Sequence, residues 1–341
     1  MNGEQTVLVT GGSGYIGGWC VATLLERGYQ VRATVRSLAR EGAVRAAIAT
    51  VVDPGERLTF HAANLTSDAG WDAAAEGCDF VLHVASPLGV PEPKDPDDLI
   101  VPARDGALRA LNAAIKAGVK RVVMTSSVAA TGGSYNAHDG TFDETVWTDA
   151  GDTRIGAYAR SKTIAERAAW DLIAASGGET QLAVINPALV LGPVMGADFS
   201  DSVQVVQRLL TGKIPGLPRL GFNVVDVRDV ADLQLRAMTA PEAAGQRFIA
   251  AADYEWMEDM AAILRRHLGA AAAKVPTRKA PDFAIRLAAL FDRDLASVTP
   301  GLSRRRDFTS AKARDLLGWR PRGAEETILD CARSLIAHGA V

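Results

Sequence analysis

The chain has 341 residues, 48% of them hydrophobic and 23% charged, which is enough to bury a sizeable core in one large or two modest domains. Its formal net charge of −3 gives no electrostatic reason to expect nucleic acid or a membrane surface as a partner. We expect a cytoplasmic protein, because the sequence shows no signal-peptide pattern and no long apolar run, and its three cysteines are too far apart for a disulfide framework.

The stretch TVLVTGGSGYIGG predicts a dinucleotide-binding turn. Its apolar run predicts a strand that ends in Thr10, and an amphipathic helix begins at Ile16. The glycines follow a GxxGxxG spacing, which permits a tight turn, a close approach of a pyrophosphate and close packing of helix on strand. An ordinary turn also uses glycines, but the strand before it and the helix after it favour phosphate binding. The predicted contacts are Gly11, Ser13, Gly14, Tyr15, Ile16 and Gly17.

Residues 29–37 predict a second strand with β-branched residues at alternate positions. An Asp or Glu at its end would bind the ribose 2′-hydroxyl of NAD, but this chain has Arg36 there and its first acid is Glu41. A guanidinium suits a 2′-phosphate, so we expect NADP(H), with Arg40 as a weaker second contact. If Arg36 is only a solvated cation at a strand end, the choice of cofactor stays open.

Residues 57–61 predict a third strand, which leads into Asn64 and Leu65. These two residues stand where a loop would cover the adenine. The alternative for this segment is a helix N-cap near Thr66 or Ser67.

Two more strands are predicted over residues 79–85 and 120–125. They run into Ser86 and into the pair Ser126 and Ser127, and strand ends in parallel sheets deliver residues to a cofactor. Serines at a strand end can also simply satisfy backbone groups. Their meaning therefore depends on the helix that follows.

A helix predicted over residues 157–175 carries Tyr158 and Lys162 one turn apart on one face. A phenol with a pKa near 10 is a poor acid–base group at neutral pH, and a neighbouring ammonium stabilises the phenolate. The pair is therefore a candidate proton donor to a carbonyl, although such pairs more often lie on a surface. A strand over residues 182–186 follows and ends at Pro187.

The alternation of strands and helices predicts an α/β fold with a Rossmann-type, doubly wound parallel sheet that is covered on both faces. The pattern loosens after residue 190, which indicates a smaller, interwoven C-terminal substrate lobe. We assign residues 1–190 to the dinucleotide-binding domain and residues 191–341 mainly to the substrate lobe, and expect residues 221–250 to return to the first domain. The five histidines are scattered, so we expect no metal.

With TGGSGYIG, HVASP, TSS, YARSK and NPALVLGP in this order, the chain resembles the extended short-chain dehydrogenase/reductase superfamily from about residue 6 to residue 319. It is most similar to the dihydroflavonol reductase-like branch, which includes microbial NADP-dependent carbonyl reductases. The resemblance implies that Tyr158 donates a proton, Ser127 holds the carbonyl oxygen, and Lys162 binds the ribose and lowers the pKa of Tyr158. Further implied cofactor contacts are Asn64, Leu65, Val84, Ala85, Ser86, Ser126, Pro187, Leu189, Val190 and Ser202.

The resemblance breaks at Gly132, where plant flavonoid reductases carry an asparagine that binds substrate hydroxyls. Dihydroflavonols are therefore doubtful substrates. Apolar linings favour a bulky, aromatic or apolar ketone or aldehyde. The candidate substrate residues are Val90, Val128, Tyr135, Met195, Phe199 and Phe222.

Other functions share parts of this pattern. A hydroxysteroid dehydrogenase or a sugar-nucleotide epimerase would use the same serine, tyrosine and lysine, whereas a dehydratase would carry an Asp-Glu pair that is missing here. An NADP-sensing regulator of similar fold usually lacks the tyrosine and lysine. We expect a small-molecule carbonyl or alcohol as the partner, and leave monomer and homodimer open.

Overall fold

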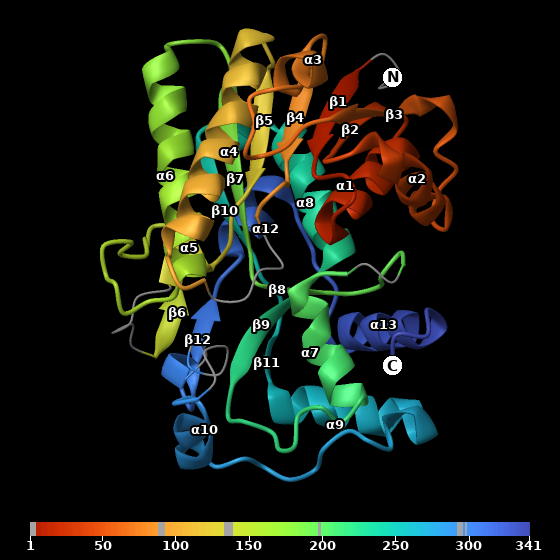
Figure 1. Ribbon diagram of the computed structural model, residues 1–341, viewed down its shortest axis with the longest axis vertical. Helices are drawn as coiled ribbons and strands as arrows, with labels where there is room; N and C mark the ends of the chain where they lie inside the picture. The colour runs from red at the N-terminus through yellow and green to blue at the C-terminus, as the bar shows by residue number, and fades with distance from the viewer. Residues whose placement is uncertain (1–4, 88–92, 133–138, 197–198, 292–295, 297–298) are drawn as a thin grey trace.

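The computed structural model describes residues 5–87, 93–132, 139–196, 199–291, 296 and 299–341. A parallel sheet of seven strands, in the order β10-β7-β5-β4-β1-β2-β3, forms its centre (Figure 1). From β1 the chain first builds β2 and β3 on one side and then crosses to β4 on the other, so β1 and β4 mark the switch point where such sheets bind ligands. The strands are β1 (Thr6–Thr10), β2 (Gln30–Val35), β3 (Leu58–Ala62), β4 (Phe80–His83), β5 (Arg121–Thr125), β7 (Gln181–Pro187) and β10 (Gln246–Ala250).

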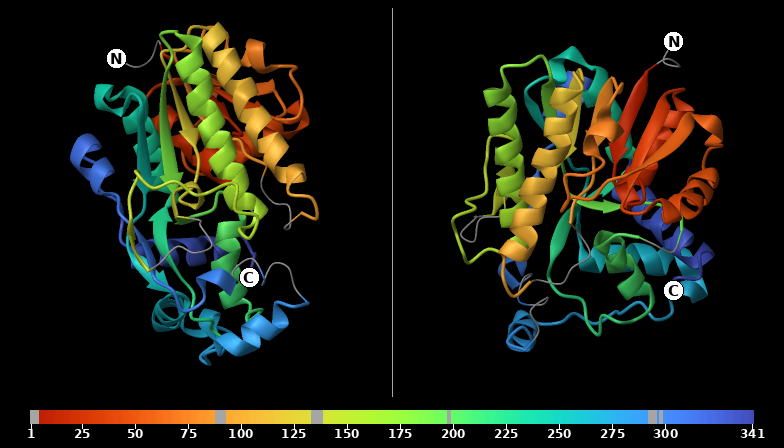
Figure 2. Two further views of the ribbon diagram at one scale, coloured as in Figure 1. Left: turned by 90° about the vertical axis from the view of Figure 1, so that its left-hand side faces the viewer. Right: turned by 45° about the horizontal axis from the view of Figure 1, so that its top comes forward.

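Helices cover both faces of this sheet, as the two further views show (Figure 2). One apolar core contains residues of α3, α4 and α6, and a second core on the opposite face contains residues of α1, α2 and α8. The predicted doubly wound parallel α/β fold is confirmed. These helices are α1 (Tyr15–Glu26), α2 (Glu41–Ala49), α3 (Trp71–Ala75), α4 (Asp97–Lys116), α6 (Ala157–Ser176) and α8 (Val227–Thr239).

A smaller unit lies below the carboxyl ends of these strands (Figure 1). Its sheet has the order β11-β9-β8, and a third apolar core joins it to α7, α9 and α13. A separate parallel pair, β6 and β12, lies at its side. The elements of the smaller unit are β6 (Gly140–Phe142), β8 (Leu189–Leu191), β9 (Gly221–Asp226), β11 (Tyr254–Trp256), β12 (Arg306–Phe308), α7 (Asp201–Leu210), α9 (Met257–Leu268), α10 (Asp282–Ala288) and α13 (Ala324–Ala337). Two further helices lie with the large sheet: α5 (Ala129–Gly132) beside α6 and β7, and α12 (Ala311–Leu317) beside β10 and α8.

Short 3-10 turns complete the described structure; they are η1 (Leu38–Arg40), η2 (Gly55–Arg57), η3 (Pro241–Ala243), η4 (Gly269–Ala272) and η5 (Thr299–Gly301). No helix among the described residues combines the length and the apolar character needed to cross a membrane.

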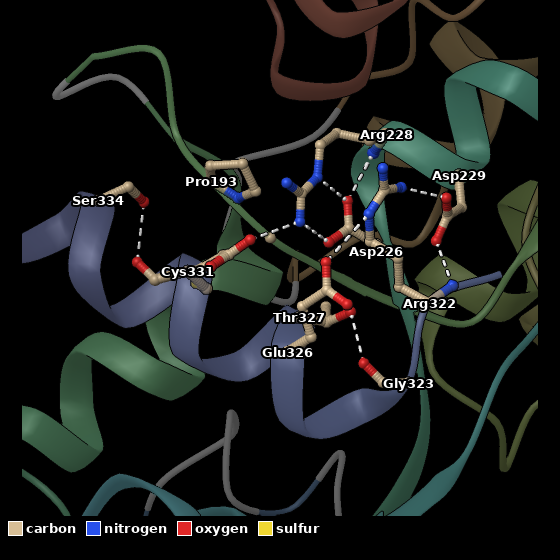
Figure 3. A network of polar contacts seen from close by, with 12 residues as sticks. Pro193, Asp226, Arg228, Asp229, Arg322, Gly323, Glu326, Thr327, Cys331 and Ser334 are labelled. Carbon is tan, nitrogen blue, oxygen red and sulfur yellow. Dashed lines mark hydrogen bonds and ion pairs between the residues drawn. The ribbon is translucent and has the colours of Figure 1, made fainter. Parts of the chain in front are cut away.

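An ion-pair network joins α13 to the chain where β9 passes into α8 (Figure 3). Arg228 donates to the buried carboxylate of Asp226 and to Asp330 of α13, both at 2.7 Å. The backbone N–H of Arg322 donates to Asp229 at 2.7 Å. The network thus stabilises the point where the chain leaves the sheet of the smaller unit at the end of β9. The next elements, α8 and β10, lie with the large sheet.

Candidate active site

The glycine-rich turn connects β1 to α1 at the switch point. Gly11 has a φ of +70°, a left-handed conformation that favours glycine, and a Cβ at Gly17 would lie 2.2 Å from the carbonyl oxygen of Gly11. Gly14 is the N-cap of α1, and among the described residues no side chain caps this helix and no acidic residue lies in its first turn. The N–H groups of the first turn therefore remain free to bind an anion.

The side chains beside this turn point into the protein. The hydroxyl of Tyr15 donates to the carbonyl oxygen of Gly192 at 2.8 Å, and Ile16 packs against the core of the large sheet. Ser13 lies half-buried in the turn itself. Because both side chains are engaged within the protein, Tyr15 and Ile16 would contact the cofactor through their main-chain atoms.

Thr10, at the end of β1, fixes the segment after β4. Its hydroxyl oxygen accepts from the N–H groups of Val84 and Ala85 at 3.1 and 3.0 Å and lies 2.9 Å from Nδ1 of His83. A Cβ at Gly11 would meet the Cα of Ala85 at 2.9 Å, so this predicted cofactor segment touches the glycine turn. Burial lowers the pKa of His83 to about 3, which keeps the ring neutral as a core residue.

The end of β2 also touches the glycine turn. The N–H of Gly11 donates to the hydroxyl of Thr34 at 3.0 Å, and the N–H of Gly12 donates to the carbonyl of the same residue at 3.0 Å. Arg36 follows two positions later and is exposed, without an ion pair to any residue that the structure describes. Arg40 lies on η1 just beyond. Arg36 therefore follows the strand end that contacts the glycine turn, and its contact with a 2′-phosphate stays a prediction.

Asn64 differs from its predicted role. Its Oδ1 accepts from both the N–H and the hydroxyl of Thr66 at 3.2 Å, so the amide oxygen closes a local turn. The adenine amino group is a donor and needs an acceptor, so its predicted bond would share this oxygen with the turn and stays a prediction. The amide nitrogen of Asn64 is the group left for a ligand. Leu65 packs against Gly106 of α4, where a Cβ would come within 2.6 Å of its side chain.

The predicted catalytic side chains of β5 and α6 come together. Ser127 lies close enough to Tyr158 to lower the pKa of its phenol, and the Ser127 hydroxyl accepts from the N–H of Ala129 at 3.1 Å. Nζ of Lys162 lies 5.9 Å from the centre of the Tyr158 ring. Ser127 and Lys162 are buried, whereas Tyr158 is 37% exposed, so a substrate can reach the phenol.

The electrostatics of this group differ from the expectation for Tyr158. Burial raises its pKa above 10 and outweighs the lowering by the Ser127 hydrogen bond, and the carboxylate of Asp201 raises the pKa further. Solvent at the exposed part of the ring moderates this rise. The predicted lowering by Lys162 does not dominate here, and the phenol is protonated at neutral pH, as a proton donor must be. Burial lowers the pKa of Lys162 to about 8, so its ammonium also stays protonated at neutral pH.

The remaining predicted cofactor residues follow neighbouring strand ends. The N–H of Ser126 donates to Ile185 in β7 at 2.7 Å, and the N–H of Val128 donates to Pro187 at 3.0 Å, so the ends of β5 and β7 are tied together. The hydroxyl of Ser126 is buried without a hydrogen-bond partner among the described residues. Ser86 follows β4, and Leu189 and Val190 form β8. The hydroxyl of Ser202 donates to the carbonyl of Val190 at 2.7 Å.

Four of the six candidate substrate residues lie among the described residues. Val128 lies beside Ser127, and Phe199 and Phe222 pack, half-buried, against the core of the smaller unit. Met195 lies over α1, with its sulfur 3.5 Å from where a Cβ of Gly18 would be, so this position does not favour a substrate role. The other two predicted residues, Val90 and Tyr135, lie outside the described residues.

Three buried polar residues next to the catalytic group were not predicted. Glu166 lies one turn after Lys162 on α6, Asn186 lies in β7, and Arg247 lies in β10. The spacing YxxxKxxxE was visible in the sequence, but the partners of Glu166 are 20 and 81 residues away. Among the described residues, no group of three or more His, Cys, Asp or Glu could hold a metal ion.

Comparison with known proteins gives consistent results. Residues 7–251 match the NAD dependent epimerase/dehydratase family. Cinnamoyl-CoA reductase 1 of Arabidopsis thaliana is 38% identical over 249 residues, 72% of this chain and 70% of that enzyme, and dihydroflavonol 4-reductase of Zea mays is 35% identical over 276 residues, 77% and 74% of the two chains. Yeast methylglyoxal/isovaleraldehyde reductase complexed with NADPH has a TM-score of 0.81 at 26% identity, covering 99% of this chain and 100% of that chain.

Proposed function

The chain belongs to the NAD dependent epimerase/dehydratase family, and from this membership we propose that it is an NADPH-dependent reductase of a bulky, aromatic or apolar ketone or aldehyde. The reaction is reversible, so the enzyme also oxidises the alcohol back to the carbonyl compound. The resemblance to extended short-chain dehydrogenases/reductases is confirmed, and the reductase relatives support an oxidoreductase that acts on carbonyl or alcohol groups. The observation that carries the proposal is the grouping of Ser127 and Tyr158 with the ammonium of Lys162 beside the Tyr158 ring.

The residues present fit a dinucleotide. The uncapped start of α1 offers N–H groups to a pyrophosphate, and a Cβ on Gly11 or Gly17 would clash with neighbouring backbone. The orphaned hydroxyl of Ser126 needs a partner that the described protein residues do not supply. A structural relative was solved with NADPH, which supports NADP(H) as the cofactor of this chain.

NADPH, when bound, supplies the hydride for the carbonyl carbon. The hydroxyl of Ser127 then holds the carbonyl oxygen, and the protonated phenol of Tyr158 donates its proton to that oxygen as negative charge develops there. Lys162 stabilises the phenolate that remains and binds the ribose hydroxyls. The exposed part of Tyr158 provides the side from which the substrate approaches.

The surroundings of Gly132 support an apolar substrate over a polyhydroxylated one. A Cβ at Gly132 would lie 2.9 Å from the ring of Phe308, which itself lies 5.7 Å from the ring of Phe142. Phe308 thus occupies the space that a hydrogen-bonding side chain at this position would need. Several curated relatives are named for aromatic substrates, which agrees with a bulky aromatic carbonyl compound.

Replacing Arg36 by aspartate will weaken NADPH binding by about 10- to 100-fold and improve NADH binding. The change removes a charge-assisted partner of the 2′-phosphate, which contributes about 1.5–3 kcal/mol, and adds an acceptor for the 2′-hydroxyl. The measurement is the dissociation constant of each cofactor by fluorescence titration. Arg27→Asp is the control, because Arg27 lies at the far end of α1 and pairs with Asp232. Equal NADPH affinity in wild type and Arg36→Asp would contradict a contact between Arg36 and the 2′-phosphate.

The direct test of the function is the loss of absorbance of NADPH, and separately of NADH, with a panel of aryl ketones, aldehydes, keto esters and steroids. Rapid oxidation of NADPH with an aryl ketone and formation of its alcohol are the expected result. Oxidation restricted to steroids would favour a hydroxysteroid dehydrogenase. Intact cofactor binding without any oxidation would point to an epimerase or an NADP-sensing regulator.

We also propose a reducing, cytoplasmic location, because Cys20, Cys78 and Cys331 are all free and buried. The test is thiol labelling of protein isolated from its natural source and denatured without a reductant. Three labelled thiols are expected, and a disulfide would contradict the proposed location.

A further inference from the structure

A buried ion pair lies directly behind the catalytic residues. Nε of Arg247 donates to Glu166 at 2.5 Å, and the relative exposures of the two side chains are 8% and 0%. The guanidinium is further held by the carbonyls of Glu144 and Val146 at 2.8 and 3.2 Å, and its Cζ lies 3.6 Å from the centre of the Trp147 ring. Arg247 is thus fixed on several sides, and Glu166 is fixed with it.

The second oxygen of Glu166 leads to Ser127. Nδ2 of Asn186 donates to Oε2 of Glu166 at 2.9 Å and to the carbonyl oxygen of Ser127 at 3.1 Å. Both partners are acceptors, so the amide nitrogen of Asn186 must face them. The side chain of Asn186 therefore connects Glu166 to the main chain of Ser127.

The charge of Glu166 also acts on Lys162. The two residues are one helical turn apart on α6, both are buried, and the carboxylate favours the ammonium against the effect of burial. The other titratable groups near this ammonium are the phenol of Tyr158 and the neutral ring of His83 in β4. Among the described residues, Glu166 is the only charged side chain with a resolved effect on the pKa of Lys162.

We propose that Glu166 is a positioning residue of the active site, which keeps Lys162 charged and fixes the main chain of Ser127 through Asn186. The inference deepens the proposed reductase function and rests on it for its catalytic meaning. Glu166 touches neither substrate nor cofactor; it acts through residues that do. Arg247 keeps the buried carboxylate ionised and orients it.

The test follows the titration of Lys162 in protein that carries 13Cε-labelled lysine, with the resonance assigned by its absence in Lys162→Met. In wild type we expect a midpoint near 8. Glu166→Gln should lower it by about one to two pH units, because a buried carboxylate about one helical turn away is removed. An unchanged midpoint in a folded Glu166→Gln protein would overturn the proposal.

Arg247→Gln is the matched control, because it also breaks the buried pair but leaves the carboxylate of Glu166 beside Lys162. Its Lys162 midpoint should stay or rise, whereas a merely structural role of the pair would move both variants alike. If Glu166→Gln fails to fold with Arg247 unpaired, the double variant Glu166→Gln/Arg247→Gln removes both charges. Its midpoint should lie below that of Arg247→Gln, and equal midpoints would overturn the proposal.

Activity provides a separate readout. With NADPH saturating, the alkaline limb of the pH profile of kcat/KM should move to lower pH in Glu166→Gln and not in Arg247→Gln. Asn186→Leu should lower kcat roughly 10-fold through a displaced Ser127 while Lys162 titrates as in wild type. If wild type reduces no carbonyl compound, the proposed function fails, but the titration needs neither cofactor nor substrate and still decides the role of Glu166.

Discussion

Replacing Tyr158 by phenylalanine will lower kcat for ketone reduction by about 10²- to 10⁴-fold, the range typical of a lost general acid. The ring and its packing remain, but the alkoxide that develops on the substrate no longer has a proton donor. NADPH binding should change little, because Lys162 and the glycine turn are intact. Steady-state kinetics with an aryl ketone, together with a fluorescence titration of NADPH, measure both effects.

Tyr254→Phe is the control for this variant. Tyr254 also loses a hydroxyl hydrogen bond, to the carbonyl of Arg304 at 3.3 Å, but it lies in β11 of the smaller unit. Its kcat should be that of wild type. An active Tyr158→Phe enzyme would show that another group donates the proton, and the pairing with Ser127 would then have only a structural role.

Replacing Gly17 by alanine will weaken NADPH binding by about 10- to 100-fold. The new Cβ would lie 2.2 Å from the carbonyl oxygen of Gly11, so the glycine turn and the start of α1 must move apart. Overpacking of this kind costs about 1–3 kcal/mol, and the displaced N–H groups no longer converge on the pyrophosphate. The dissociation constant for NADPH and the midpoint of thermal unfolding measure the loss.

Gly18→Ala is a closely matched control, one position further along the same helix. Its Cβ would meet the sulfur of Met195 at 3.5 Å and the carbonyl oxygen of Gly12 at 3.9 Å, both ordinary contact distances. Because alanine favours a helix over glycine, this variant should bind NADPH normally and be at least as stable as wild type. Equal NADPH affinity of the two variants would contradict the role of the turn.

The centre of the large sheet could be predicted because β1, β4 and β5 are apolar runs between turns, as burial on both faces requires. The pair β6 and β12 could not, because each strand has three residues and its partner lies far along the chain. α3 is similarly too short, at five residues, to show a helical period. The predicted helix start at Ile16 was one residue late, since α1 begins at Tyr15.

The catalytic group was predictable where its signal is local. Tyr158 and Lys162 share one face of one helix, so their spacing made them candidates, whereas the role of Ser127 came from the family resemblance. Glu166 and Arg247 meet only through packing of α6 beside the edge strand β10, which no local pattern reveals. The sequence also does not show that the side-chain oxygen of Asn64 accepts a hydrogen bond within a local turn.

The pKa of Tyr158 shows a similar limit. The sequence places an ammonium one turn away and so predicts a lowered pKa for Tyr158. The desolvation of Tyr158 on folding cannot be predicted from the sequence pattern. In the structure burial dominates, so the phenol is a stronger candidate for a proton donor than for a base at neutral pH.

Transfer of deuterium from NADPH labelled with two deuterium atoms at C4 of the nicotinamide tests the central claim most directly. With an aryl ketone that wild type reduces, mass spectrometry should find one deuterium on the carbinol carbon of the product, and Tyr158→Phe should form this product about 10²- to 10⁴-fold more slowly. Tight binding of the labelled cofactor with no deuterium in any carbonyl compound of the panel would contradict a carbonyl reductase.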